Sequence, residues 1–342
     1  MSMDDRVKQN MKSKKHLSKR AGILLGIAFA VGMLALLWLH DNDLAAQMEE
    51  LIKKIVATGI ILVALVVYFL VYDKLVVLPR ELWSNRRLIW KLAKNDFKTR
   101  YAGSYLGMVW ALAQPVVTIL LYWFVFGMLM PAKAQVAGNL DVPYVIWLTA
   151  GLVPWFYFSE ALCNGTNALL EYNYLVKKVV FKISVLPIIK VLGATFIHVF
   201  FTCVMLVIYF CLGFAPSLYL LQIPYYSLCL LAFVLALCYS TCAIVVFFRD
   251  LNQIINIFLQ VFMWATPILW NISLLGNPVL QFIFKLNPIF YIVNGYRSAM
   301  FENTWFWQDF YSTMYFWIVV VVLFGLGALI FKRLKVHFAD VM

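Results

Sequence analysis

Residues 94–127 read "KNDFKTRYAGSYLGMVWALAQPVVTILLYWFVFG", and this stretch decides the class of fold. It passes from a run of Lys, Asp and Arg directly into an apolar segment that is long enough to cross a bilayer as a helix. A Gln-Pro pair, Gln114-Pro115, lies inside the apolar segment, although a simple membrane anchor needs neither residue. Because proline bends a helix, the stretch predicts a kinked membrane span.

The whole chain shares this apolar character. Of its 342 residues, 64% are hydrophobic and 13% charged, with a mean hydropathy of +0.86. A soluble domain is about half apolar and a quarter charged. The composition therefore predicts an all-α integral membrane protein that crosses the membrane several times. The expected spans are residues 21–39, 55–72, 104–130, 143–165, 186–214, 225–248, 254–272 and 311–331.

The positive charges are distributed unevenly among the loops between these spans. If the N-terminus is cytoplasmic, all but five of the 28 Lys and Arg residues are cytoplasmic, the exceptions being Lys53, Lys54, Lys133, Lys285 and Arg297. Cytoplasmic loops of membrane proteins are enriched in Lys and Arg, so the asymmetry predicts an even number of spans with both termini inside. The net charge of +12 then reflects topology, and nucleic acid is not an expected partner.

Two segments are expected to lie along the membrane surface instead of crossing it. In residues 79–103, aromatic residues recur every seven positions with cations between them, which predicts a helix in the cytoplasmic headgroup layer. Residues 273–310 are broken by Pro278, Pro288 and Gly295, which indicates re-entrant or interfacial helices at the outer end. Residues 1–78 are expected to form a separate two-span hairpin with a basic tail, ahead of a six-span unit at 79–342.

Catalytic and metal-binding motifs are absent from the sequence. It contains no GxxxxGK[ST], HExxH or GxSxG, and its six cysteines show no CxxC spacing. Glu160 and His198 are ionisable groups inside predicted spans, which suggests a proton relay. The favoured alternative is structural, with Glu160 hydrogen-bonded between helices near Asn164 and Asn167.

Several aromatic residues lie deep in predicted spans, where a ring face can pack against the C–H groups of a sugar. Packing against lipid or other helices is the alternative for any one of them. Residues 166–190 alternate apolar and charged positions, which is typical of a short amphipathic helix that docks a soluble partner or lies on the membrane.

Seven stretches, in order, resemble the membrane subunit of ABC exporters that move polysaccharides such as O-antigen, capsule or teichoic acid. The resemblance begins in residues 96–127 and extends over about residues 80–342. The other six stretches are "GLVPWFYFSEAL" at 151–162, "LVKKVVF" at 175–181, "FFRDLNQI" at 247–254, "ATPILWN" at 265–271, "LNPIFYIVNGYRSAMF" at 286–301 and "FKRLKVHFADVM" at 331–342.

The resemblance implies a homodimeric permease in a bacterial cytoplasmic membrane, bound to two copies of a separate ATP-binding subunit that carries ATP and Mg²⁺. The cargo would be a polysaccharide on a polyprenyl diphosphate lipid, and this chain would bind no cofactor or metal. The cytoplasmic gate helix, which would meet the lipid diphosphate, would include Trp83, Arg86, Arg87, Trp90, Lys94, Lys98 and Arg100.

The same resemblance gives two further sets of residues their expected roles. It would place Trp110, Tyr122 and Trp123 on or near the channel wall, and Trp264 and Trp270, which lie deep in another predicted span, are further candidates for it. Contacts to the ATP-binding subunit would come from Glu171, Asn173, Lys177, Lys178, Phe181, Arg249 and Asp250.

The sequence also departs from the family pattern and leaves rival functions open. Phe181 is followed by Lys182 and Ile183, where the family usually has Phe-Pro-Arg. The rivals are an ABC exporter of drugs or simple lipids, a proton-coupled transporter that uses Glu160 and His198, and a membrane glycosyltransferase or acyltransferase.

Overall fold

The computed structural model describes residues 22–39 and 51–69 in part, and residues 83–100, 107, 109–129, 134–135, 141–176 and 182–341. The chain forms two compact units, Met1–Pro79 and Arg80–Met342. In the first unit, a helical stretch at Gly22–Leu39 is long and apolar enough to span a membrane. The Tyr68 hydroxyl donates to the Gly22 carbonyl oxygen at 3.0 Å, and Trp38 Nε1 donates to Thr58 Oγ1 at 3.3 Å. These bonds join the helical residues of 22–39 to those of 51–69.

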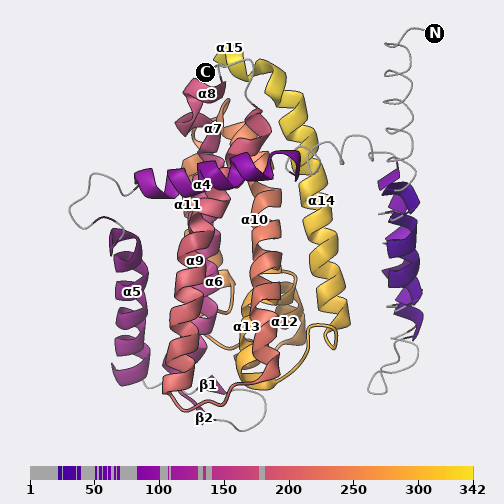
Figure 1. The fold of residues 1–342 in the computed structure, drawn as a ribbon. Coiled ribbons are helices and arrows are strands. Elements are labelled where there is room, and N and C mark those ends of the chain that lie inside the picture. Colours follow the sequence, from indigo (N-terminus) through magenta and orange to yellow (C-terminus); the bar gives the residue numbers. More distant parts are fainter. Residues whose placement is uncertain are drawn as a thin grey trace. The chain divides into compact units, whose positions relative to one another are not determined.

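The second unit is a helical bundle (Figure 1). Its longer helices are α4 (Arg86–Arg100), α5 (Val109–Trp123), α6 (Tyr144–Thr166), α9 (Leu186–Cys211), α10 (Ile223–Val245), α11 (Leu251–Ala265), α12 (Pro278–Lys285), α13 (Pro288–Arg297) and α14 (Phe310–Leu334). The short helices are α7 (Ala168–Glu171), α8 (Asn173–Val176) and α15 (Phe338–Val341). Short π-helical segments occupy Phe124–Leu129 and Ser298–Glu302, and short 3₁₀ segments occupy Ile183–Val185, Leu218–Gln222, Ile272–Leu274 and Lys335–His337.

One small β-ladder interrupts this helical chain. Strands β1 (Ala134–Gln135) and β2 (Asp141–Val142) pair antiparallel, with Ala134 opposite Val142. The ladder was not predicted, but it lies in the connection between α5 and α6 and leaves the helical class of the fold intact.

Helix α6 forms the centre of the bundle and is buried along most of its length, against α9, α10 and α13. Its apolar residues lie on all sides, as expected of a helix surrounded by others. Gly165 permits close packing, because a Cβ there would collide with the Cys238 side chain of α10. At one end of the bundle α4 crosses the long helices near α7, α8 and α15, whereas α12 and α13 lie at the opposite end (Figure 1).

Five helices are long and apolar enough to cross a membrane: Gly22–Leu39, Tyr144–Thr166, Ile183–Cys211, Leu218–Val245 and Phe310–His337. Each coincides with one of the eight predicted spans, which confirms a multi-span, all-helical protein. The expected spans 104–130 and 254–272 contain the shorter apolar helices Leu112–Phe126 and Leu251–Ala265. Residues 55–72 lie partly outside the described residues, so the count of eight stays a prediction.

Proline explains why α11 ends before the boundary expected from hydropathy. Thr266, which follows the last helical residue, has φ −92° and ψ 129°. The ring of Pro267 disfavours helical geometry at the residue before it, so the helix stops at Ala265 although the apolar sequence continues.

Arg297 fastens the end of α13 to the turn that follows α11. The side chain is 6% exposed, and its Nη1 and Nη2 donate to the carbonyl oxygens of Pro267 and Ile268, each at 2.7 Å. The guanidinium also lies 3.4 Å from the ring centroid of Trp147 on α6. Residues 288–301 are therefore anchored in the bundle, whereas α12 before them has no buried residue.

Candidate functional site

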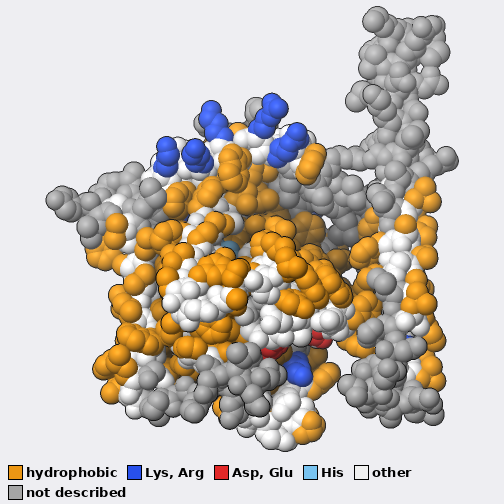
Figure 2. All heavy atoms as spheres, turned by 60° about the horizontal axis from the view of Figure 1, so that its bottom comes forward, with side chains coloured by type: hydrophobic (Ala, Val, Ile, Leu, Met, Phe, Trp, Pro, Cys, Tyr) orange, Lys and Arg blue, Asp and Glu red, His pale blue; other side chains and the backbone are white. Residues whose placement is uncertain are grey.

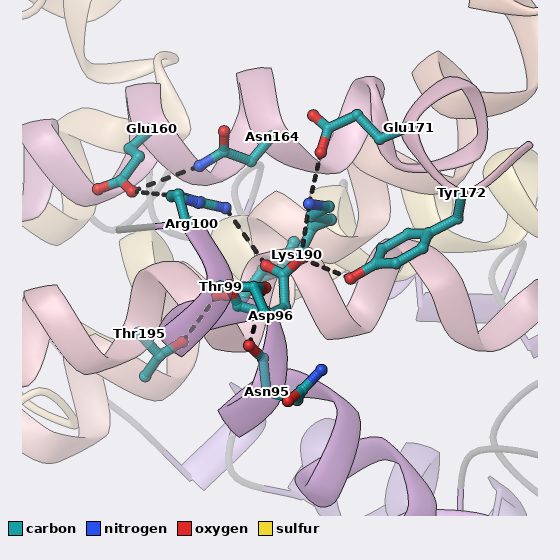
Figure 3. Close-up of polar contacts among 11 residues, drawn as sticks. Asn95, Asp96, Thr99, Arg100, Glu160, Asn164, Glu171, Tyr172, Lys190 and Thr195 are labelled. Carbon is teal, nitrogen blue, oxygen red and sulfur yellow. Dashed lines mark hydrogen bonds and ion pairs between the residues drawn. The ribbon is translucent and has the colours of Figure 1, made fainter. Parts of the chain in front are cut away.

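A network of charged side chains joins α4 to the start of α9 and to α7 (Figure 3). Asp96 of α4 accepts a hydrogen bond at 2.7 Å from the ammonium group of Lys190 on α9, and both side chains are 6% exposed. Lys190 also pairs with the carboxylate of Glu171 at the end of α7. The Tyr172 hydroxyl donates to the same Asp96 oxygen that Lys190 contacts. One buried lysine therefore holds three separate elements together.

Burial makes this arrangement sensitive to change. A charge removed from water costs several kcal/mol unless a partner compensates it, and here Asp96 and Lys190 compensate each other. The Lys190 ammonium also lies 4.8 Å from the ring centroid of Tyr172, a favourable cation–π geometry. Burial and the hydrogen bond to Asp96 raise the pKa of Tyr172 above its usual value, so its hydroxyl stays protonated as a donor.

Arg100 extends the network from α4 to α6. Its Nη1 donates to Glu160 Oε1 at 2.9 Å, and its Nη2 lies 3.5 Å from Asp96 Oδ2. Asn164 donates to the same Glu160 oxygen at 3.4 Å. The predicted hydrogen bonding of Glu160 between helices is thus confirmed, with Arg100 as a partner that the sequence did not suggest.

Glu160 also lines a cavity of about 750 Å³ between α5, α6, α9 and α11. Helix α11 contributes three amide side chains, Gln253, Asn256 and Gln260, at intervals of three and four residues, which place them on one helix face. A side-chain amide both donates and accepts hydrogen bonds, as a sugar hydroxyl does. Among the other lining residues are Trp110, Gln114, Pro115, Phe156, Tyr157, Asn164 and His198. The Gln-Pro pair of the opening stretch therefore faces a partly polar cavity.

His198 belongs to a hydrogen-bonded group separate from the Glu160 pair. Its Nε2 lies 3.2 Å from Ser227 Oγ and 3.1 Å from the Tyr296 hydroxyl, and its ring stacks on Tyr157 at 4.6 Å. Glu160 instead binds Arg100 and Asn164. Both residues line the cavity, but they engage different partners.

Of the predicted channel residues, Trp110 lines this cavity, whereas Tyr122, Trp123, Trp264 and Trp270 are not among the described residues around it. Trp264 is 60% exposed, and Trp270 Nε1 donates to the Trp264 carbonyl oxygen at 3.1 Å. Tyr122 packs against Phe126, and Trp123 is partly exposed on α5. The structure thus gathers one of the five around the cavity.

The predicted gate helix is α4, preceded by the helical residue Trp83. Its buried face is formed by Ile89, Ala93 and Asp96, and the rings of Trp90 and Phe97 contact Phe196 of α9. Trp83 and Trp90 remain largely exposed. The exposed cations on this helix are Arg86, Arg87, Lys91, Lys94 and Lys98. Figure 2 shows Lys and Arg side chains gathered along one end of the bundle.

The residues predicted to contact an ATP-binding subunit are in part exposed, in part in helix α8, and in part outside the described residues. Glu171 is half-exposed, and Arg249 and Asp250 are exposed in the turn between α10 and α11. Asn173 lies in α8 with a buried side-chain oxygen that lacks a hydrogen-bond partner among the described residues. Lys177, Lys178 and Phe181 lie outside the described residues. Among those described, no group of three or more His, Cys, Asp or Glu side chains is placed to hold a metal ion.

Sequence reasoning missed the buried network and the amide face of α11. Asp96 is an acid within a strongly basic helix, and this is the one signal that marked it for a specific partner. Gln253, Asn256 and Gln260 recur at helical spacing in an otherwise apolar stretch, and this spacing is the sequence signal for the amide face.

Comparison with known proteins finds a matching family and similar permeases. The sequence profile of the ABC-2 type transporter family matches residues 87–301. The O-antigen export system permease protein RfbA of Myxococcus xanthus is 30% identical over 265 residues, which cover 77% of this chain and 98% of the relative. A protein of the same description from Klebsiella pneumoniae is 27% identical over 253 residues, which cover 73% of this chain and 93% of the relative.

Proposed function

Since the chain belongs to the ABC-2 type transporter family, we propose that it is the permease subunit of an ATP-driven exporter for O-antigen polysaccharide. The similarity to O-antigen export permeases over nearly their whole length carries this proposal. The cargo crosses the cytoplasmic membrane as a polysaccharide attached to a polyprenyl diphosphate lipid. The working assembly is a homodimer of this chain with two copies of an ATP-binding subunit.

The cavity between α5, α6, α9 and α11 supports a path for sugars. Gln114, Gln253, Asn256 and Gln260 offer several neutral hydrogen bonds, each worth only about 1 kcal/mol net. A polymer held by many such bonds is released from each one easily, which suits stepwise movement. A cavity for drugs or simple lipids needs an apolar lining instead, so the amides favour the saccharide.

Replacing the three amides of α11 by leucine, as Gln253→Leu with Asn256→Leu and Gln260→Leu, should lower polysaccharide export about tenfold or more. The apolar side chains remove the neutral donors and acceptors while keeping a good helix former at each position. Export is measured as O-antigen at the cell surface, with membrane levels of the protein measured in parallel. Ile257→Ala, on the same helix but outside the cavity, is the control and should export normally. Normal export by the triple variant would exclude the cavity from the path.

The exposed cations of α4 support a cytoplasmic position for its end of the bundle, because cytoplasmic surfaces of membrane proteins are enriched in Lys and Arg. The distribution of Lys and Arg among the loops places both termini in the cytoplasm in this proposal. Helices α12 and α13, at the end of the bundle opposite α4, then lie at the outer end (Figure 1). Arg86, Arg87, Lys94 and Lys98 would meet the anionic diphosphate of the incoming lipid, with Trp83 and Trp90 in the headgroup layer.

The buried network supports a route by which ATP binding moves the gate. Glu171 lies in the segment expected to contact the ATP-binding subunit, together with Asn173, Lys177, Lys178, Phe181 and the Arg249-Asp250 turn. Through Lys190 it is connected to Asp96 of α4, so a displacement of the loop pulls directly on the gate helix.

Removing both basic side chains of that loop, Lys177→Ala with Lys178→Ala, should reduce export and recovery of the ATP-binding subunit while leaving folding intact. The two cations are expected to supply contacts to the partner and none to the bundle core. Co-purification and surface O-antigen are the two measurements, and Lys332→Ala on α14 is the control. Wild-type export by the double variant would refute the coupling role.

The proposal as a whole is tested by gentle purification of the protein from its native membranes, followed by mass spectrometry of the proteins that accompany it. A stoichiometric subunit with a GxxxxGK[ST] motif is the expected result. If the intact, abundant protein carried no such subunit, the proton-coupled alternative would replace the ABC exporter, and Glu160 would be the first residue to test.

A further inference from the structure

A second cavity, of about 290 Å³, lies among α10, α12, α13, the 302–309 loop and the start of α14. These elements are at the opposite end of the bundle from α4 (Figure 1). Figure 2 looks toward that end and shows acidic and basic side chains close together on it. The export path described above uses none of the residues that line this cavity.

The wall of this cavity is held in place before any ligand arrives. Gln222, which is 2% exposed, donates from Nε2 to the Thr304 carbonyl oxygen at 2.9 Å and accepts at 2.7 Å from the Phe306 backbone N–H. The Thr313 hydroxyl donates to the Phe306 carbonyl oxygen at 2.8 Å. Hydrogen bonds therefore hold the 302–309 loop on both sides of Trp305. Because this wall of the cavity is already ordered, a ligand that binds there does not incur the entropic cost of ordering the loop.

The charged groups that line the cavity are oriented but not neutralised. Ser298 donates to Glu302 at 2.7 Å, and Ser312 donates to Asp309 at 2.9 Å. Within the described part of the chain, neither carboxylate has a cation within 4.0 Å, although Lys285 lines the same cavity. A carboxylate can accept about four hydrogen bonds, so Glu302 and Asp309 both keep free acceptor capacity.

From this lining we propose that the cavity binds a single uncharged sugar ring of the emerging polysaccharide. The inference rests on the proposed function, because the polysaccharide is the cargo assumed there. Its volume is at the low end for a ligand cavity, which fits one ring and not a long segment.

The side chains that line the cavity suit both the hydroxyl groups and the C–H groups of a sugar ring. The carboxylates accept from hydroxyl groups, Lys285 donates to them, and Phe290 adds an aromatic ring to the lining for the C–H groups. Trp305 also lines the cavity, with its ring stacked on that of Trp307 at 4.5 Å between centroids. Two acids against one lysine leave the cavity net negative, which disfavours a phosphate or diphosphate. A ring held here, beyond the membrane path, would hinder backward sliding of the chain between ATP cycles.

The test is a binding titration on the purified complex with its ATP-binding subunit, using lipid-free oligosaccharides cut from the O-polysaccharide of the producing bacterium. The reference protein carries the three leucine substitutions on α11, so that the remaining binding reports on the second cavity. Adding Glu302→Gln and Asp309→Asn should raise the Kd at least tenfold, because hydrogen bonds to charged groups are the stronger ones. Lys332→Gln, an exposed change at the far end of α14, should leave the Kd unchanged.

Asp309→Asn alone tests the same point with little risk to folding, since Asp309 is exposed. An unchanged Kd in both cavity variants would overturn the inference, and so would a cavity that binds Ca²⁺ and ignores the oligosaccharide. If the wild-type complex exports the polymer while the cavity variants bind it normally, only this inference fails. If the wild-type complex neither exports nor binds the polymer, the proposed function itself fails.

Discussion

Replacing Lys190 by methionine should abolish export and lower the free energy of unfolding of the protein by about 3–5 kcal/mol. The change removes the ammonium group that lies 2.7 Å from Asp96, so this carboxylate is left buried without its main counter-charge. Arg100 compensates it poorly from 3.5 Å, because Arg100 is also engaged with Glu160. The measurements are surface O-antigen and the midpoint of thermal unfolding of the purified permease. Lys332→Met, which changes an exposed lysine on α14, is the control and should change neither.

A second pair of variants separates the loss of stability from the loss of coupling. Asp96→Leu combined with Lys190→Met removes both buried charges, and replacing a whole buried ion pair by apolar groups is often neutral for stability. Glu171→Gln keeps the Lys190–Asp96 pair and weakens only the connection to α7. We expect near-normal unfolding but reduced export from both. Normal export by either variant would show that the network is a structural element and does not transmit the movement of the loop.

The fold was predictable from the sequence to the extent that its determinants are local. Hydropathy located the five long helices because a span needs only a continuous apolar run. It failed at α11, where Pro267 ends the helix within an apolar stretch, and it gave no sign of the β1–β2 ladder. Both depend on backbone geometry, which a hydropathy pattern does not register.

The candidate site was less predictable, because its determinants are distant in the sequence. Asp96 and Lys190 are 94 residues apart, so no periodicity connects them. Their meeting depends on how α4 crosses α9, and that follows from the packing of Ile89, Ala93 and Phe97. Glu160 was interpreted correctly as a hydrogen-bonded acid because Asn164 lies one helical turn away.

Arg297→Met should destabilise the end of the bundle that holds α12 and α13 by about 3 kcal/mol, an effect of the same order as that of Lys190→Met. Two opposing contributions decide whether Arg297→Met raises or lowers the free energy of unfolding. Methionine removes the cost of burying a guanidinium. It also leaves the carbonyl oxygens of Pro267 and Ile268 without the hydrogen bonds that Arg297 donates at 2.7 Å, and it removes the cation–π contact with the Trp147 ring. We expect the second contribution to dominate, because no carboxylate shares Arg297 with these acceptors among the described residues and the contacts are short.

The lysine variant tests this reasoning. Arg297→Lys retains the buried charge but replaces a planar fork by a point charge, which reaches fewer acceptors and stacks less well on a ring. It should therefore unfold at least as readily as Arg297→Met, with protease cleavage within residues 266–302 rising in both variants. Lys285→Met on exposed α12 is the matched control and should unfold as the wild type does. If Arg297→Met were instead more stable than the wild type, the cost of burying the charge would exceed the three contacts, and Arg297 would be retained for a reason other than stability.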